Sequence, residues 1–225
     1  MNPLVKRTLQ IVFLIVVQGV CLFAAAGQLT WLAAWAYMGL YVGIIALNAA
    51  LMLPGGKELI AERSKYLENA RGWDRLVMLL WMLLGPGMLL VAGLDQRWSW
   101  SPPLALPLRI VAFVLMAAGF GFFSWAMYVN RFFASRVRIQ EERGHSVTTG
   151  GPYRFVRHPG YIGTIVYSLV TPFVLGSLWA IIPGVLLAAV VVVRTALEDR
   201  TLQAELPGYA EYAQKTRYRL VPGVW

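Results

Sequence analysis

The sequence predicts an all-α integral membrane protein with about six transmembrane helices, the last two forming a tight helical hairpin ahead of a cytoplasmic C-terminal tail. Of its 225 residues, 58% are hydrophobic and 14% are charged, and the mean hydropathy is +0.60. A soluble domain of this length could not hide so much apolar surface. The apolar residues also fall into long runs separated by charged loops, which is the pattern of a multi-pass protein.

The first four apolar runs have the length of membrane-spanning helices. Since a helix rises 1.5 Å per residue, each run can cross a hydrocarbon core of about 30 Å. We therefore expect residues 1–130 to form a unit of four N-terminal spans, and residues 131–225 to form a second unit of loop, hairpin and tail. The four runs are residues 9–26, 29–53, 76–94 and 104–129.

The last two apolar runs are shorter and almost continuous. They cover residues 161–175 and 178–193, with only two residues between them. Helices joined this closely must lie antiparallel, and the second can continue to Leu202 without a Gly or Pro break. Pro172 and Pro183 lie inside this hairpin, where each removes a backbone donor and is expected to kink its helix.

Basic residues mark one side of the predicted membrane. Such a bias places both termini in the cytoplasm, in the inner or plasma membrane if the protein is bacterial. The net charge of +9 then fits loops facing an anionic lipid surface, and no basic run with interleaved aromatics points to nucleic acid. The basic side holds Lys6, Arg7 and the loops 57–75 and 131–157, whereas the opposite loops offer little beyond Arg97 and Arg109.

Two polar segments lie on the predicted cytoplasmic side. Charges of both signs alternate at near-helical spacing through residues 57–74, which predicts a solvated surface helix. The tail from Pro207 to Trp225 mixes tyrosines with basic residues. That composition suits either the lipid headgroup region or a lid folded over a pocket.

Several kinds of active site find no support in the sequence. His145 and His158 have no Cys or carboxylate at ligand spacing, so we expect no metal site. The single cysteine, Cys21, rules out a disulfide framework. No serine stands in the Gly-x-Ser-x-Gly turn of an acyl-enzyme.

Ionisable residues instead gather where the hairpin begins and ends, and such residues at a membrane edge usually mark function. Pro159 restricts His158 to an extended backbone, so Arg157 and His158 are displayed from a turn near a helix N-terminus, which favours anions. Arg194 and Glu198 are four residues apart and share a helix face, about 6 Å apart along the axis. The simpler alternative is a topology signal with a snorkelling ion pair.

These residues also carry a family resemblance. The motifs that carry it are Gln140, His145-Ser146-Val147-Thr148, Gly150-Gly151-Pro152-Tyr153, Arg157-His158-Pro159-Gly160-Tyr161, Arg194, Glu198-Asp199 and the Pro-Gly-Tyr tail. Together they resemble the isoprenylcysteine carboxyl methyltransferase family. The resemblance spans roughly residues 132–225, and it implies that residues 131–225 form a methyltransferase core that binds S-adenosylmethionine. It implies a cofactor site of Gln140, His145, Ser146, Val147, Thr148, Tyr153, His158, Pro159, Gly160, Tyr161 and Glu198, with Arg194 facing the methyl acceptor.

The side-chain chemistry suits this assignment. Arg157 or His158 can meet the cofactor carboxylate, and Glu198 can accept from its ammonium or ribose. A carboxylate acceptor is already ionised, and Arg194 can hold it by a bidentate contact. We therefore predict a membrane methyltransferase with Arg194 and Glu198 as catalytic residues. Its expected acceptor is lipophilic, above all an isoprenylcysteine carboxylate, and its expected surroundings are membrane lipids.

Other functions remain open at this stage. A phospholipid amine or a thiol could be the acceptor in the same architecture, and an amine would require Glu198 or Asp199 to take up a proton. Membrane sterol reductases, which use NADPH, resemble the chain through an Arg-His-Pro-x-Tyr turn, but that turn commonly has Asn where this chain has Gly160. A non-catalytic scaffold or transporter subunit is the third alternative. The family commonly has a second Glu where this chain has Asp199, whose side chain is one methylene shorter.

Overall fold

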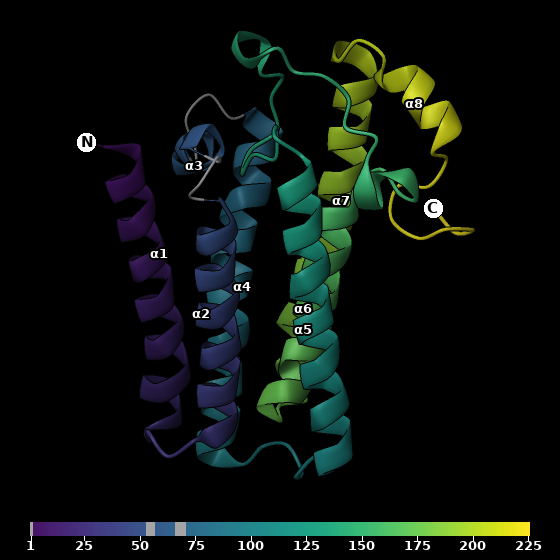
Figure 1. The fold of residues 1–225 in the computed structure, drawn as a ribbon. Coiled ribbons are helices and arrows are strands. Elements are labelled where there is room, and N and C mark those ends of the chain that lie inside the picture. The colour runs from purple at the N-terminus through teal and green to yellow at the C-terminus, as the bar shows by residue number, and fades with distance from the viewer. Residues whose placement is uncertain (1, 53–56, 66–70) are drawn as a thin grey trace.

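The computed structural model describes residues 2–52, 57–65 and 71–225 and shows a bundle of long helices standing side by side (Figure 1). Its described residues contain no strand, so the prediction of an all-α fold is confirmed. Both chain termini lie at the same end of the bundle (Figure 1). The helices are α1 (Pro3–Gly19, extended by a π-helical turn, Val20–Ala24), α2 (Leu32–Met52), α3 (Lys57–Ser64), α4 (Gly72–Trp98), α5 (Leu106–Val129), α6 (Pro159–Leu175), α7 (Ile181–Glu205) and α8 (Tyr209–Lys215).

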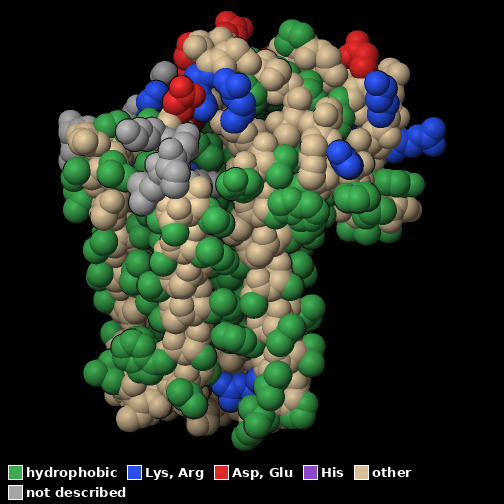
Figure 2. Space-filling view, in the orientation of Figure 1, with side chains coloured by type: hydrophobic (Ala, Val, Ile, Leu, Met, Phe, Trp, Pro, Cys, Tyr) green, Lys and Arg blue, Asp and Glu red, His purple; other side chains and the backbone are tan. Residues whose placement is uncertain are grey.

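Five of the described segments are long and apolar enough to cross a membrane. They are Pro3–Ala24, Leu32–Leu51, Gly72–Trp98, Leu106–Val129 and Ile181–Glu205. Helix α6 is also apolar but has only 17 residues. Hydrophobic side chains cover the shaft of the bundle, while most charged ones gather at the end that carries the termini (Figure 2). The chain is therefore a multi-pass membrane protein.

The hairpin of α6 and α7 differs in detail from the prediction. Helix α6 ends at Leu175 and is capped by Gly176, which has φ +81°. Helix α7 begins only at Ile181, so the linker has five residues, 176–180. Helix α7 then extends to Glu205, beyond the predicted Leu202. Pro172 lies inside α6, but Pro183 is in the first turn of α7, where its missing N–H costs no helical hydrogen bond. The kink expected at Pro183 is therefore not required.

Glycines let three helices approach closely. A Cβ on Gly163 of α6 would lie 2.4 Å from the carbonyl oxygen of Gly119 on α5, and one on Gly184 of α7 would lie 2.6 Å from that of Ser168 on α6. Small residues at such crossings are the usual means of tight helix packing in a membrane. Helices α5, α6 and α7 therefore form one tightly packed unit that fixes the positions of the side chains at its ends.

The loop between α2 and α4 is not the solvated helix that the charge pattern predicted. Helix α3 covers only Lys57–Ser64, and its Glu62 is 3% exposed. Asp74 belongs to the first turn of α4 and is completely buried. The prediction that this segment is exposed to solvent is therefore wrong for Glu62 and Asp74. Residues 66–70, which the prediction also included, lie outside the described residues.

The C-terminal tail folds back beside the turn that precedes α6. The backbone N–H of Arg157 donates to the carbonyl of Tyr218 at 2.9 Å, and that of His158 donates to the carbonyl of Arg219 at 3.0 Å. Tyr209 and Tyr212 of α8 are buried beneath it. The tail thus covers the end of the hairpin.

Candidate active site

A cavity of about 320 Å³ lies at the end of the bundle that carries the termini. Its walls come from all eight described α-helices, α1 to α8, and from the loop between α5 and α6. Pro159 begins α6 and is not among the lining residues. The other predicted site residues all line it: Gln140, His145, Ser146, Val147, Thr148, Tyr153, Arg157, His158, Gly160, Tyr161, Arg194 and Glu198.

Asp199 is the most heavily hydrogen-bonded side chain beside this cavity, although it is completely buried. A buried carboxylate is costly unless several donors satisfy it. Here the donors come from α7, from α8, from the turn before α6 and from the tail, so the shorter Asp does reach its partners. They are Arg157 Nε (2.7 Å) and Nη2 (3.0 Å), Gln203 Nε2 (2.8 Å), Arg219 Nε (2.9 Å), Tyr209 Oη (3.1 Å) and His158 Nε2 (3.1 Å).

Arg157 has protein partners at every nitrogen of its guanidinium. Besides the two bonds to Asp199, its Nη1 donates to the carbonyls of Thr216 at 2.8 Å and Arg217 at 2.7 Å. Burial disfavours the charged form, but the hydrogen bonds to Asp199 prevail and raise the pKa of Arg157. These contacts fasten the tail to the hairpin. That Arg157 or His158 meets the cofactor carboxylate stays a prediction.

Arg194 is held in place by a residue that the sequence patterns did not single out. Its Nε donates to Asp74 Oδ1 at 3.0 Å, and its Nη2 donates to the carbonyl of Ser135 at 2.8 Å. The second oxygen of Asp74 accepts the backbone N–H of Val137 at 2.7 Å. Asp74 therefore joins α4, α7 and the loop 130–140. The one signal in the sequence was its position two residues before an apolar run.

Tyr161 connects Arg194 to Glu198. The guanidinium carbon of Arg194 lies 5.8 Å from the centre of the Tyr161 ring, and the Tyr161 hydroxyl donates to Glu198 Oε2. Both charged side chains line the cavity, in agreement with their spacing on one helix face. The three residues form one wall that carries a cation, an aromatic face and a carboxylate.

Gln140 and His145 shape the loop that forms the opposite wall. Gln140 is 1% exposed; its Nε2 donates to the carbonyl of Phe132 at 2.8 Å, and its Oε1 accepts from Arg143. Its backbone N–H donates to His145 Nδ1 at 3.2 Å. Burial, aided by Arg138 and Arg143, lowers the pKa of His145 to about 4. The imidazole is therefore neutral at pH 7, and its proton is on Nε2.

Asn130, at the end of α5, forms hydrogen bonds to two other residues of the cavity wall. No sequence pattern predicted this role. Asn130 Nδ2 donates to the Tyr153 hydroxyl at 3.2 Å, and its Oδ1 accepts from Thr148 Oγ1 at 3.2 Å. The carbonyl of Tyr153 accepts from the Tyr212 hydroxyl at 2.7 Å. Burial raises the pKa of Tyr153, which keeps the phenol neutral. Val147 packs against the apolar cluster beneath α8.

Gly160 is required by the packing beside the cavity. A Cβ at this position would lie 2.8 Å from Cε2 and Cζ of the Phe133 ring. Phe133 is itself covered by Arg63 of α3, whose guanidinium carbon lies 5.4 Å from the ring centre. Any larger residue at 160 would have to displace this ring.

The sequence of this part of the chain matches known proteins. The family model for the isoprenylcysteine carboxyl methyltransferase (ICMT) family matches residues 110–204. Protein-S-isoprenylcysteine O-methyltransferase A of Arabidopsis thaliana is 31% identical over 88 residues, which are 39% of this chain and 41% of the relative. Protein-S-isoprenylcysteine O-methyltransferase B of the same plant is 28% identical over 125 residues, 55% of this chain and 60% of the relative.

The chain thus spans less than two thirds of the length of both relatives. The matched region runs from the first turns of α5 almost to the end of α7. It includes the Arg157 to Tyr161 motif, Arg194 and the Glu198-Asp199 pair. Residues 110–204 of the chain are therefore similar to the isoprenylcysteine carboxyl methyltransferase family.

Proposed function

We propose that this protein is a membrane methyltransferase that uses S-adenosylmethionine and methylates the carboxylate of a lipophilic acceptor of isoprenylcysteine type. In this proposal α6 is a sixth span, both termini are cytoplasmic, and residues 131–225 form the catalytic core behind an N-terminal unit, residues 1–130. The observation that carries it is a single cavity with a polar end and an apolar end. The two named relatives are methyltransferases, which supports the same reaction.

The polar end has the groups that S-adenosylmethionine requires. Glu198 offers an acceptor for its ammonium or ribose hydroxyls, and the neutral His145 offers an Nε2–H donor to the cofactor. Tyr153, Tyr161 and Val147 provide apolar surface for the adenine. When bound, the cofactor supplies an electrophilic methyl group. Ser146, Thr148, His158 and Gly160 complete the proposed cofactor site together with Gln140. Pro159 begins the helix that presents Gly160 and Tyr161, and Arg157 acts by holding the His158 backbone against the tail.

The apolar end fits an acceptor that arrives from the membrane. Leu14 of α1, Tyr41 of α2, and Met78 and Trp81 of α4 continue the cavity from the charged wall into the bundle. An acceptor tail placed there would bring its polar head to Arg194. This arrangement suits a molecule with one long apolar chain and one ionised group.

Arg194 is the residue that we assign to the acceptor carboxylate. A carboxylate is ionised at neutral pH, so the reaction requires orientation rather than proton removal. Guanidinium groups bind carboxylates through two parallel hydrogen bonds, and Asp74 and Ser135 fix the plane of this one. Glu198 lies one helical turn away and keeps Tyr161 in place through the hydroxyl contact. We assign it to the cofactor side of the site.

Ligand-dependent thermal stabilisation tests the cofactor assignment. The purified full chain is heated in a neutral detergent with S-adenosylmethionine, S-adenosylhomocysteine or NADPH. A ligand that binds only the folded protein adds about 2.7 kcal/mol of stability at 100 times its Kd. We expect both sulfur ligands to raise the Tm and NADPH to leave it unchanged. Stabilisation by NADPH alone would contradict the proposal and support a reductase.

A further inference from the structure

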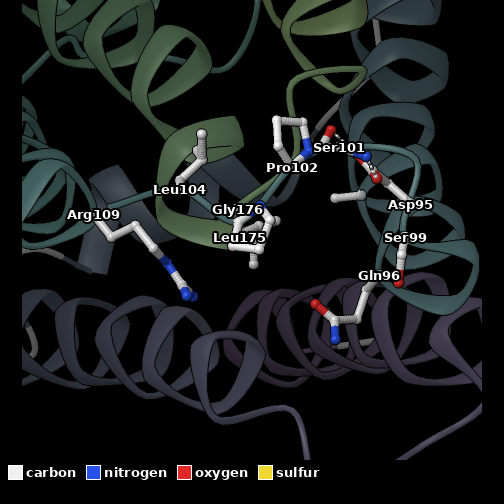
Figure 3. Close-up of a pocket in the computed structure, with 11 residues that line it drawn as sticks. Asp95, Gln96, Ser99, Ser101, Pro102, Leu104, Arg109, Leu175 and Gly176 are labelled. Carbon is white, nitrogen blue, oxygen red and sulfur yellow. Dashed lines mark hydrogen bonds between the residues drawn. The ribbon is translucent and has the colours of Figure 1, made fainter. Parts of the chain in front are cut away.

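A second cavity of about 400 Å³ lies at the other end of the bundle, where the loop between α4 and α5 lies (Figure 1). Figure 3 shows the residues that line it. The cavity is bounded by the end of α4, the loop between α4 and α5, the start of α5 and the end of α6. Nothing in the proposed methyl transfer uses it. Its polar residues include Arg109, Gln96 and Ser99, and its apolar walls include Leu104 and Leu175.

Arg109 brings a positive charge into this cavity that no carboxylate among the described residues neutralises. Among the described residues, its guanidinium makes one hydrogen bond, from Nη2 to the carbonyl of Val174 at 3.3 Å, and it forms no ion pair. That contact caps the last turn of α6 and uses one of the five N–H donors of the side chain. The remaining donors face the space that Figure 3 shows between Arg109 and Gln96.

The nearby carboxylate of Asp95 is already occupied by other donors. It accepts the backbone N–H of Ser101 at 2.8 Å and the hydroxyls of Ser101 at 2.6 Å and Ser177 at 2.5 Å. These bonds tie the loop after α4 to the linker between α6 and α7. Asp95 therefore stabilises the walls of the cavity and leaves the charge of Arg109 available.

Gln96 and Ser99 provide further donors opposite Arg109. Both residues are exposed and line the cavity, and no hydrogen bond joins either side chain to another described residue. The Gln96 amide and the Arg109 guanidinium reach toward the same space from opposite sides (Figure 3). A guanidinium, an amide and a hydroxyl around one space match the oxygens of a phosphate group.

Exposed tryptophans around this cavity indicate that it lies at the level of a membrane–water interface. Trp98 and Trp100 are 55% and 48% exposed and stack with ring centroids 5.4 Å apart beside it. Trp179, in the linker between α6 and α7, is 53% exposed. Exposed tryptophans at the ends of spanning helices typically lie at the level of the lipid headgroups. A phosphate at this depth belongs to a phospholipid.

We propose that this cavity binds the phosphate of an anionic phospholipid from the leaflet opposite the candidate active site. Arg109 holds the phosphate oxygens, Gln96 and Ser99 donate to them, and the acyl chains lie along the apolar outer surface of the bundle. The site is separate from the methyl-transfer cavity, so its occupancy is measured by lipid binding alone.

Lipid titration of the full chain in neutral detergent tests this site, with native mass spectrometry counting retained phosphatidylglycerol. We expect Arg109→Gln to weaken retention of the tightest-bound lipid at least tenfold, about 1.4 kcal/mol. Gln96→Glu changes an exposed residue and should weaken it in the same direction through charge repulsion. Arg97→Gln is the matched control, because Arg97 lies at the same end but outside the cavity, and it should bind as the wild type does.

Three results would overturn the proposal. The first is equal lipid retention by the wild type, Arg109→Gln and Gln96→Glu. The second is an equal loss of retention in Arg109→Gln and Arg97→Gln. The third is displacement of phosphatidylglycerol by millimolar inorganic phosphate, which would assign the site to a free anion and not to a lipid. Retention that is sensitive to residues 109 and 96 and insensitive to phosphate supports the lipid site.

Discussion

Asp199 on α7 and Arg157 in the turn before α6 form a buried two-point ion pair, with Nε to Oδ1 at 2.7 Å and Nη2 to Oδ2 at 3.0 Å. The same guanidinium binds two carbonyls of the tail, and the same carboxylate binds Arg219. The pair therefore joins the two ends of the hairpin to the C-terminal tail. The geometry of the proposed cofactor site depends on this junction.

Asp199→Asn should destabilise the protein and release the tail. The amide leaves Arg157 buried without a countercharge, and removing one partner of a buried pair typically costs about 3 kcal/mol or more. We expect a lower Tm and faster proteolysis within residues 207–225. Arg200→Ala, an exposed neighbour on the same helix, is the control and should behave as the wild type. Equal protease resistance in both variants would show that the junction does not hold the tail.

Asp74→Asn should impair the use of the acceptor while cofactor binding is retained. Asp74 orients Arg194 through Nε, so a neutral amide loosens the guanidinium proposed to bind the carboxylate. We expect kcat/KM for the acceptor to fall about tenfold, equivalent to about 1.4 kcal/mol of transition-state stabilisation. Isothermal titration with S-adenosylhomocysteine should give an affinity close to that of the wild type. A loss of cofactor affinity equal to the loss in kcat/KM would contradict this division of roles.

Local patterns in the sequence located the five helices long enough to span a membrane, the hairpin and the shared face of Arg194 and Glu198. These features depend on hydrophobic runs and helical spacing, which neighbouring residues determine. The partner of Arg194 is Asp74, 120 residues earlier, in a loop whose alternating charges indicated exposure. No local sequence pattern can predict a contact between residues that are 120 positions apart. Burial of Glu62 against Arg136 and Arg138 escaped prediction for the same reason.

The pH dependence of stability should include a contribution from His145. Its pKa is about 4 in the folded protein and near 6.5 when unfolded. The unfolded chain therefore binds more protons between these values, and stability falls as the pH drops from about 6.5 toward 4. We expect the fall in Tm between pH 7 and pH 5 to be smaller in His145→Gln than in the wild type. An identical fall in Tm in the wild type and in His145→Gln would show that a group other than His145 causes it.

Gly163→Ala should disrupt the contact between α5 and α6. The new methyl group would meet the backbone carbonyl of Gly119, which cannot move without separating the helices. Overpacking of this kind costs about 1–3 kcal/mol. Gly121→Ala is the matched control, because a Cβ there meets nothing within 4 Å. Chemical denaturation in mixed micelles compares the two variants, and equal stability would refute the close packing inferred at Gly163.

Methyl transfer from radiolabelled S-adenosylmethionine to an N-acetylated S-prenylcysteine, by the full chain in lipid vesicles, tests the proposed function most directly. We predict label that base releases as methanol, because a carboxyl methyl ester is hydrolysed by alkali whereas a methylated amine is not. Arg194→Gln should lower this signal at least tenfold, or about 1.4 kcal/mol. Base-stable label in the lipid fraction, or no label above that of empty vesicles, would contradict the assignment.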